Sequence, residues 1–221
     1  MNAPAPRRTT QAASAKPTRR ALAKQRTTDN ILAQGRRLFD EHGYDAATLR
    51  DVARAANVST GAVFGNFVNK AALFVGVINA DCEELARRMD AAKAAQDGAI
   101  EAVLRLLAIA QDHHAGSVGL IRSAISFAWR RDIGPELSEL TGPGLIRDRL
   151  AAALRRGVET GELCLPADAR IVSQQLLSGY LAAYAPTAAV PTKDLHVLQV
   201  AQAKGLLTGY AANCKSRSRA A

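Results

Sequence analysis

The stretch Thr48–Phe67 constrains the fold most, because it predicts two short helices joined by a tight turn. Thr48 is placed to cap the first helix, and Asp51 follows three residues later, where a carboxylate favours a helix start. The apolar residues of this helix recur at helical spacing: Leu49, Val52, Ala53 and Ala56. Asn57 stands where the chain must turn, and Asn tolerates the left-handed conformation better than most residues. Ser59 can cap the second helix, so the stretch predicts a helix-turn-helix unit, which places a recognition helix in the DNA major groove.

The composition and the periodicity indicate an all-α fold. The chain has 221 residues, 48% of them apolar, and Ala and Leu dominate without alternation or an internal repeat. Such a length can bury one large core or two small ones. The first helix should begin near Thr27 or Thr28 and end at Gly43, and it would form a three-helix head with the two helices above. Further helices are predicted at about 70–95, 99–114, 118–130, 145–160, 167–185 and 193–212.

The net charge of +9 is concentrated at the two ends of the chain. The first 26 residues carry seven basic side chains and no acidic one: Arg7, Arg8, Lys16, Arg19, Arg20, Lys24 and Arg26. Lys215, Arg217 and Arg219 form a second basic tail. Residues 1–25 are therefore predicted to be a disordered basic arm. Their composition also resembles that of an organelle transit peptide, but an arm beside a DNA-binding motif explains the same residues better.

Several classes of protein are excluded by what the sequence lacks. It holds no apolar run of about 18 residues that would span a membrane, no secretory signal, no nucleotide-binding glycine loop, no zinc motif and no nucleophile elbow. We therefore expect neither an enzyme nor a bound metal ion or cofactor. Cys82, Cys164 and Cys214 are widely separated, which predicts reduced thiols in an intracellular setting. His113 and His114 are adjacent and should point to different sides of their helix, so they should not pair on a metal ion.

The order of caps, turn and core residues resembles that of the TetR family of bacterial transcriptional regulators. The matching residues are Ile31, Leu32, Leu38, Phe39, Asp40, Glu41, Gly43, Tyr44, Thr48, Val52, Ala53, Ala56, Val58, Ser59, Gly61, Phe67, Lys70 and Leu73. The resemblance covers about residues 28–75 and implies a homodimer with an N-terminal DNA-binding head and a C-terminal domain for ligand binding and dimerisation. The segment Leu120–Leu165 is similar to the AefR-type C-terminal branch of that family.

With this resemblance the chain divides into four parts. Residues 1–25 are the basic arm, residues 26–69 the helix-turn-helix domain, residues 70–213 the helical effector-binding and dimerisation domain, and residues 214–221 the basic tail. A small-molecule effector is expected among the helices that span about residues 70–160. The last two predicted helices should form the subunit interface as a four-helix bundle.

The resemblance also assigns DNA contacts to individual residues: Arg26, Thr48, Ser59, Thr60, Gly61, Ala62, Phe64, Asn66 and Lys70. Thr48, Ser59 and Lys70 are expected to contact phosphates, which positions the head without reading sequence. The family usually has Tyr at Phe64, a large residue at Gly65 and Gly at Asn57. Because the recognition helix has few large or polar side chains, we expect the protein to recognise the DNA sequence by other means. These are contacts with thymine methyl groups, DNA shape, and the basic arm in a minor groove.

Two further groups of residues are candidates for the C-terminal domain. The candidate ligand site, for an aromatic or anionic effector, consists of Met89, His113, Arg122, Ser126 and Trp129. The candidate dimer interface, suggested by small residues that permit close helix contact, consists of Gly179, Tyr180, Ala183, Leu198, Gly205 and Leu206. An exposed position for Trp129 and a core position for Tyr180 are the plainer alternatives.

Together these features predict a cytoplasmic, nucleoid-associated, dimeric repressor that a small molecule releases from a pseudo-palindromic DNA operator. The alternative is an architectural, nucleoid-type DNA-binding protein with the same head and no effector. An apolar cavity in the C-terminal domain would favour the repressor, whereas a C-terminal domain that is packed solid would favour the architectural protein.

Overall fold

The computed structural model describes residues 18–92, 98–130, 134–184 and 192–220, and within the helices it describes no side chain at 134–135, 192–193 or 212–220. The described residues form α-helices and no strand, which confirms the predicted all-α fold. The helices are α1 (Arg19–Ala46), α2 (Leu49–Ala55), α3 (Thr60–Phe64), α4 (Lys70–Ala91), α5 (Ala99–His114), α6 (Val118–Ala128), α7 (Gly134–Ser138), α8 (Gly142–Glu159), α9 (Ala169–Ala182) and α10 (Thr192–Ala220).

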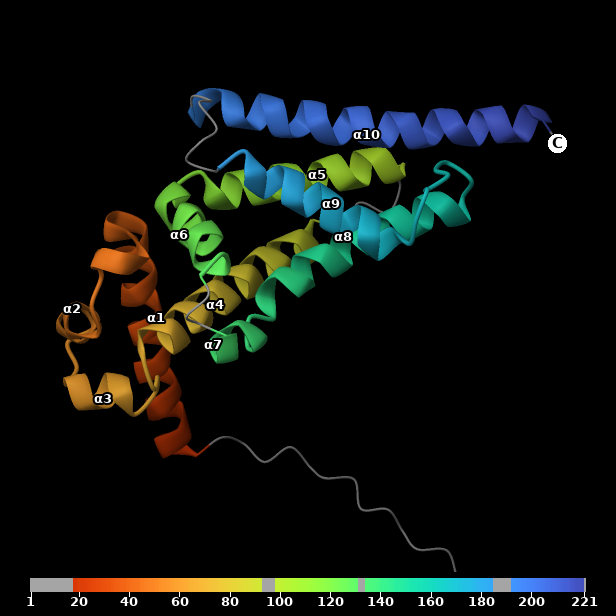
Figure 1. Ribbon diagram of the computed structural model, residues 1–221. Coiled ribbons are helices and arrows are strands. Elements are labelled where there is room, and N and C mark those ends of the chain that lie inside the picture. The colour runs from red at the N-terminus through yellow and green to blue at the C-terminus, as the bar shows by residue number, and fades with distance from the viewer. Residues whose placement is uncertain (1–17, 93–97, 131–133, 185–191, 221) are drawn as a thin grey trace, which may run out of the picture.

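The head is built by α1, α2 and α3, which lie together at one end of the molecule (Figure 1). Ile31 and Phe39 of α1, together with Val63 of α3, are completely buried in its core. The ring of Phe39 meets that of Phe74 in α4 edge to face, with centroids 4.9 Å apart. The core of the head therefore includes side chains of α4, so a shift of α4 must also displace side chains of the head.

Helix α1 begins at Arg19, so its predicted start at Thr27 or Thr28 is wrong. The hydroxyl of Thr18 accepts a hydrogen bond from the backbone N–H of Ala21 at 3.2 Å and caps the helix. Thr27 and Thr28 lie inside the helix, where the hydroxyl of Thr27 donates to the carbonyl oxygen of Ala23 at 3.1 Å. The part of the predicted disordered arm from residue 18 onward is thus ordered, and residues 1–17 lie outside the described residues.

Two left-handed backbone positions shape the head. Gly43 has a φ of 79°, and this breaks the helical conformation of α1 where the sequence predicts its end. Asn57, in the turn between α2 and α3, has a φ of 54° and is the one described residue other than glycine with a positive φ. Both positions confirm the sequence-based expectation for these turns.

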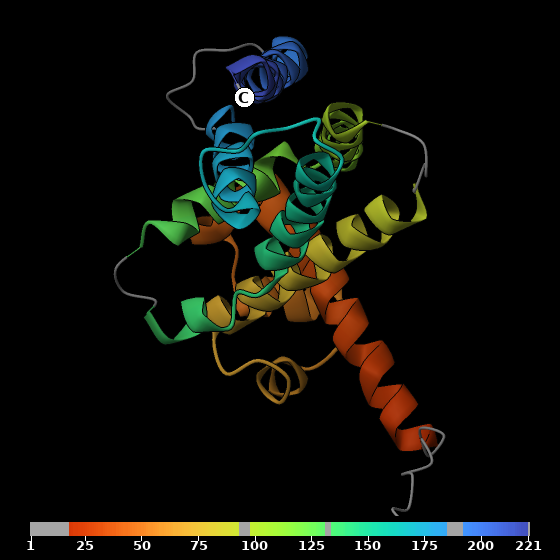
Figure 2. The same cartoon turned by 90° about the vertical axis from the view of Figure 1, so that its right-hand side faces the viewer.

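In the larger domain α5 and α8 pack against the far end of α4, α9 packs on α8, and α10 covers α5 and α9 at the edge of the molecule (Figure 2). Leu85 and Met89 of α4, Val103 of α5 and Leu150 and Leu154 of α8 are buried in its core. The bounds of α5 and the start of α4 agree with the prediction, whereas α4 ends at Ala91, before the predicted end near residue 95. Helix α8 begins at Gly142 instead of residue 145, with proline in its first turn. No helix in the described part of the chain is long and apolar enough to cross a membrane.

Helix α6 crosses α1 and holds the head against the larger domain. A Cβ atom built on Gly119 would lie 2.0 Å from the carbonyl oxygen of Asp40, so a side chain has no room at this crossing. The side chain of Asp40 accepts a hydrogen bond from the backbone N–H of Leu120 at 2.8 Å, and Asp45 forms an ion pair with Arg130 at 2.7 Å. The crossing is therefore fixed by close backbone approach and by polar contacts.

The cysteines depart from the expectation of three reduced thiols. Cys164 is disulfide-bonded, so the expectation is wrong at this position. Cys82 is free and half-buried, and burial raises the pKa of its thiol to about 12. The side chain of Cys214 lies outside the described residues.

Candidate nucleic-acid interface and internal cavity

Two exposed hydroxyl side chains cap the helices of the helix-turn-helix unit. The hydroxyl of Thr48 accepts from the backbone N–H of Asp51 at 3.2 Å and donates to the Asp51 carboxylate at 2.6 Å. The latter bond lowers the pKa of Asp51. The hydroxyl of Ser59 accepts from the backbone N–H of Ala62 at 3.1 Å. Both predicted caps are confirmed, and the phosphate contacts predicted for these hydroxyls stay a prediction.

The outer face of α3 is small and apolar. Gly61 and Gly65 are exposed, the side chain of Phe64 is 52% exposed, and Thr60 and Ala62 are half-buried. Val68, just beyond the helix, is 78% exposed. Such a surface offers van der Waals contact to thymine methyl groups and few hydrogen-bond donors to base edges.

Asn66 is half-buried and makes two hydrogen bonds within the head. Its side-chain oxygen accepts from the hydroxyl of Thr28 at 2.7 Å, and its amide N–H donates to the carbonyl oxygen of Ala62 at 2.7 Å. Each end of the amide therefore makes one bond within the head, and one N–H and one oxygen lone pair remain for the DNA contact that the resemblance predicts. Its contact with Thr28 fixes α3 against α1.

Lys70 also has a structural role. Its ammonium group donates to the carbonyl oxygens of Tyr44 and Asp45 at 2.9 and 3.1 Å and lies 4.5 Å above the Tyr44 ring. These bonds satisfy carbonyl groups at the end of α1. An ammonium group has three N–H donors, so one remains for the phosphate contact that the sequence predicts.

The first turns of α1 present a row of basic side chains. Arg19, Arg20, Lys24 and Arg26 are all exposed, and no acidic residue precedes Asp29 in the described part of the chain. Further along the same helix, Thr28 contacts Asn66 just after α3, so α3 packs against the helix that carries this row. Arg19, Arg20 and Lys24 were expected on a disordered arm, whereas the structure holds them, with Arg26, on the first turns of α1.

An internal cavity of about 100 Å³ lies between α4, α5, α6, α8 and α9. Its lining is mostly aliphatic, with Asp81, His114 and Tyr180 as its polar groups. The other lining residues are Ile78, Cys82, Leu85, Met89, Leu107, Ala110, Leu120, Ile121, Ala124, Pro143, Ile146, Leu150, Leu177 and Leu181. Met89 thus has the predicted position in a cavity of the C-terminal domain.

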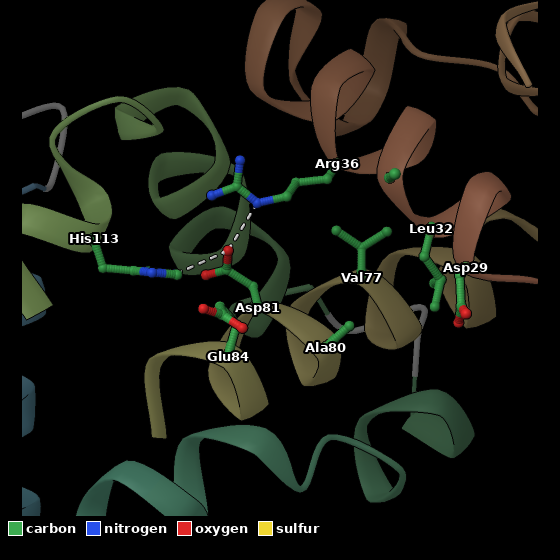
Figure 3. Close-up of a pocket in the computed structure, with 9 residues that line it drawn as sticks. Asp29, Leu32, Arg36, Val77, Ala80, Asp81, Glu84 and His113 are labelled. Carbon is green, nitrogen blue, oxygen red and sulfur yellow. Dashed lines mark hydrogen bonds and ion pairs between the residues drawn. The ribbon is translucent and has the colours of Figure 1, made fainter. Parts of the chain in front are cut away.

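The other candidate ligand residues lie elsewhere. Arg122 and Ser126 are exposed and Trp129 is 83% exposed, so their predicted place in the ligand site is wrong. The reason is that α6 turns Leu120 and Phe127 inward against the head, which directs the opposite face of α6 to solvent. His113 lines a neighbouring open pocket between α1 and α4, shown in Figure 3, instead of the internal cavity.

Asp81 in α4 is the centre of a buried polar cluster beside the cavity (Figure 3). Its Oδ1 accepts from Nε of Arg36 at 2.8 Å and lies 3.1 Å from Nε2 of His113, while Nε2 of His114 lies 3.8 Å from its Oδ2. Burial raises the pKa of Asp81, but the nearby His113 ring and the hydrogen bond from Arg36 outweigh this effect and hold the pKa below its usual value. The adjacent histidines do not point to different sides as expected, because both rings approach one carboxylate.

The same three residues have the composition of a metal site, and their ligand atoms lie within 4.8 Å of one another. Two arginines act against this use. Arg36 donates to Asp81, and Nη1 of Arg88 lies 3.2 Å from Nδ1 of His113. Because a guanidinium only donates, Nδ1 of His113 must accept, and Nε2 then carries a hydrogen and no lone pair for a metal ion. We interpret the cluster as the ion pair of Arg36 and Asp81 with two neutral histidines beside it.

The candidate dimer residues divide into two groups. Tyr180 and Ala183 are buried within the protomer, so their predicted place at the interface is wrong, and the Tyr180 hydroxyl lies 2.8 Å from Nδ1 of His114. Gly179 and Gly205 have no atom within 4 Å of a Cβ atom built on them, and Leu198 and Leu206 are half-buried. These four positions on α9 and α10 remain candidates for contact with a second subunit.

Comparison with known proteins gives related sequences for the head and related folds for most of the chain. Residues 31–77 match the profile of the bacterial regulatory proteins of the tetR family. A transcriptional repressor of Mycobacterium tuberculosis is 40% identical over 78 residues, which are 35% of this chain and 39% of the repressor. The repressor AcnR of Corynebacterium glutamicum is 27% identical over 133 residues, which are 60% of this chain and 66% of AcnR. The chain thus spans about two fifths of the length of the first of these relatives.

Two solved structures have a similar fold. FadR of Bacillus subtilis, in complex with stearoyl-CoA, has a TM-score of 0.67 at 16% identity and covers 83% of this chain and 97% of its own. RolR, in complex with resorcinol, has a TM-score of 0.64 at 18% identity and covers 89% of this chain and 94% of its own. At these identities the likeness concerns the fold alone.

Proposed function

Since this chain belongs to the TetR family of bacterial regulatory proteins, we propose that it is a transcriptional repressor that binds a pseudo-palindromic DNA operator as a homodimer and is released by a small-molecule effector. The single observation that carries the proposal is the geometry of the head. Two capped helices, joined at a left-handed turn by Asn57, present an exposed face of α3, and Thr28 and Asn66 join this unit to α1, whose first turns are basic. A helix-turn-helix unit flanked by positive charge is suited to the major groove and its phosphates.

In this proposal each residue of the head has a stated role. Ser59 caps α3 and donates its O–H to a phosphate, and the third N–H of Lys70 does the same. Thr48 caps α2 and can donate to a phosphate only when its O–H leaves the Asp51 carboxylate. Thr60, Gly61, Ala62 and Phe64 form the surface that enters the groove. Arg26 and the basic residues before it contact the phosphates that flank this surface.

The dimer is proposed to form through α9 and α10, as a four-helix bundle of two subunits. The open positions at Gly179 and Gly205 favour this arrangement, because small residues let helices of two subunits approach closely. Two heads would then dock in successive major grooves about 34–36 Å apart. A protein with this task acts in the cytoplasm, on the nucleoid.

The effector is proposed to occupy the internal cavity, and α4 to carry its effect to the head. Helix α4 lines the cavity through Leu85 and Met89 and shares the core of the head through Phe74. An effector that binds better when the heads are wrongly spaced for DNA would release the operator. The RolR and FadR complexes, which contain resorcinol and stearoyl-CoA, support a ligand-responsive function for this fold.

Selection of DNA fragments from a random pool, followed by sequencing, tests this function. The proposal predicts enrichment of a consensus with two inverted half-sites whose centres are separated by about one helical turn. Enrichment of bent or A·T-rich DNA without half-sites would support the architectural alternative instead. No enrichment at all would refute DNA binding by this head.

A further inference from the structure

The internal cavity is small and has one polar end. Aliphatic side chains of several helices form most of its wall, while Asp81, His114 and Tyr180 lie together at one side. Its volume is about 100 Å³. An engineered apolar cavity of about 150 Å³ binds benzene, so an occupant of this cavity has at most about the size of a single six-membered ring.

The charges around the cavity select a neutral occupant. None of the described residues that line it is a lysine or an arginine, and Asp81 would repel an anion. A cation would have to leave water for an aliphatic wall, and the carboxylate of Asp81 already has Arg36 as its partner at 2.8 Å. The expectation of an anionic effector is therefore not supported by this cavity.

The polar end has an unused acceptor. Nδ1 of His114 is 2.8 Å from the Tyr180 hydroxyl, which is 3.3 Å from the hydroxyl of Tyr184. These three groups therefore satisfy one another's hydrogen bonds. The carboxylate of Asp81 differs, because among the described residues no hydrogen bond reaches its Oδ2. Nε2 of His114 stands 3.8 Å from this atom, beyond hydrogen-bond distance. A hydrogen-bond donor on a molecule bound in the cavity can donate to Oδ2 of Asp81.

We propose that the effector is a neutral molecule of about one ring with a hydroxyl group, and that this hydroxyl donates to Asp81 and so weakens the bond between Asp81 and Arg36. The inference rests on the proposed function, since it names the effector of the same site. It assigns to Asp81 both the recognition of the effector and the transmission of its binding.

Arg36 connects this recognition to the head. It lies in α1, outside the cavity lining, and its guanidinium donates to Asp81 in α4 at 2.8 Å and to the hydroxyl of Ser117, before α6, at 2.7 Å. An effector hydroxyl on Asp81 draws charge density from the carboxylate and reduces its attraction for Arg36. The effector thus favours the conformation in which the bond between Arg36 and Asp81 is weakened, whereas DNA favours the conformation in which this bond is intact. Binding of either ligand therefore lowers the affinity for the other.

Titration calorimetry of the full chain tests the effector class with three small molecules, each a benzene ring with one substituent. Phenol should bind, toluene should bind at least tenfold more weakly because it lacks the hydroxyl, and benzoate should not bind. The exposed Arg122→Gln variant serves as a control and should bind phenol as the wild type does. Equal binding of toluene and phenol, or binding of benzoate, would overturn the proposal.

The link to the head is tested with an operator fragment from the DNA selection. In the wild type, phenol should weaken binding of the fragment. In Arg36→Lys, which keeps the charge but cannot hold Asp81 and Ser117 together, phenol should still bind within twofold, while its effect on DNA affinity should fall at least fivefold. The matched control is Arg37→Lys, the next residue of α1, whose partner is Glu41 on the surface. An unchanged phenol effect in Arg36→Lys would contradict the inference.

Failure of the proposed DNA-binding function and failure of the inference about the effector give different results. If the chain enriches no fragment, the proposed function fails, and calorimetry still decides the class of ligand that the cavity binds. If the fragment is bound but phenol neither binds nor releases it, the inference fails while the DNA-binding function stands.

Discussion

Nε of Arg36 in α1 donates to Oδ1 of Asp81 in α4 at 2.8 Å. The two residues are 45 positions apart in the chain, and they join the helix that carries the basic head surface to the helix that lines the cavity. A conformational change at the cavity therefore has a direct polar route to the DNA-binding surface. The same carboxylate also faces Nε2 of His113 at 3.1 Å and Nε2 of His114 at 3.8 Å.

His114 makes the fold sensitive to acid. Burial lowers its pKa from 6.5 to about 4, so the unfolded chain binds a proton at this residue that the folded chain refuses. Stability is therefore complete above pH 6.5 and falls as the pH drops from 6.5 toward 4, by about 3 kcal/mol in all. Urea unfolding at pH 7 and at pH 4.5 measures this loss. The His114→Gln variant cannot titrate here and should lose less stability over the same range; equal losses would contradict the assignment.

The crossing of α6 over α1 depends on Gly119. Because a Cβ atom would lie 2.0 Å from the backbone oxygen of Asp40, Gly119→Ala must push the helices apart. We expect a destabilisation of about 3 kcal/mol or more. The matched control is Gly116→Ala, whose added Cβ meets nothing within 4 Å and should change stability by no more than about 0.5 kcal/mol. Thermal unfolding compares the two, and equal melting temperatures would show that the crossing tolerates a side chain.

The turn of the helix-turn-helix unit depends on the left-handed backbone at Asn57. Asn57→Ala should destabilise the head by about 1 kcal/mol, because a Cβ without a polar group disfavours this conformation. Asn57→Gly removes the Cβ and should stay within about 0.5 kcal/mol of the wild type. Chemical denaturation measures the stability of both variants. If Asn57→Ala is as stable as the wild type, the turn is not strained at this residue.

The basic side chains on the first turns of α1 should contribute to DNA affinity through phosphates. Replacing Arg19, Arg20, Lys24 and Arg26 by Gln should weaken operator binding and flatten its dependence on salt, by about 0.9 in the logarithmic slope for each phosphate that the variant no longer neutralises. The control removes the same charge from exposed positions of the larger domain, through Gln at Arg87, Arg155, Arg156 and Arg170. Fluorescence anisotropy at several salt concentrations gives both slopes. An equal change in the two variants would mean that net charge alone matters.

The proposed dimer interface is open to a direct test, because a side chain at Gly205 disturbs nothing within the protomer. No atom lies within 4 Å of a Cβ atom built on Gly179 or Gly205. Gly179→Asp and Gly205→Asp should each yield monomers by sedimentation, since charge would be buried between subunits. Gly116→Asp, at an equally open position before α6, should leave the oligomeric state unchanged. Dimers in all three variants would place the interface elsewhere.

The parts of the head that depend on local chemistry were predictable from the sequence. The caps at Thr48 and Ser59 and the turn at Asn57 need nothing beyond their neighbours in the chain. The start of α1 was missed because Thr18 and Thr27 are equally good caps, and the residues between them form helix readily.

The contacts that link distant segments were not predictable in this way. The commitment of Asn66 to Thr28 and of Asp81 to Arg36 and His113 arises from tertiary packing, which helical periodicity does not encode. Trp129 was misplaced for the same reason. Both faces of α6 carry apolar residues, and the packing of Leu120 and Phe127 against the head decides which face is buried.

A hydroxyl-radical footprint on the most enriched DNA fragment tests the central claim, that two copies of this head recognise one operator. The account predicts two protected tracts, related by two-fold symmetry and centred about 34–36 Å apart on one face of the duplex. Protection that is continuous along the fragment, or a single unsymmetrical tract, would contradict it.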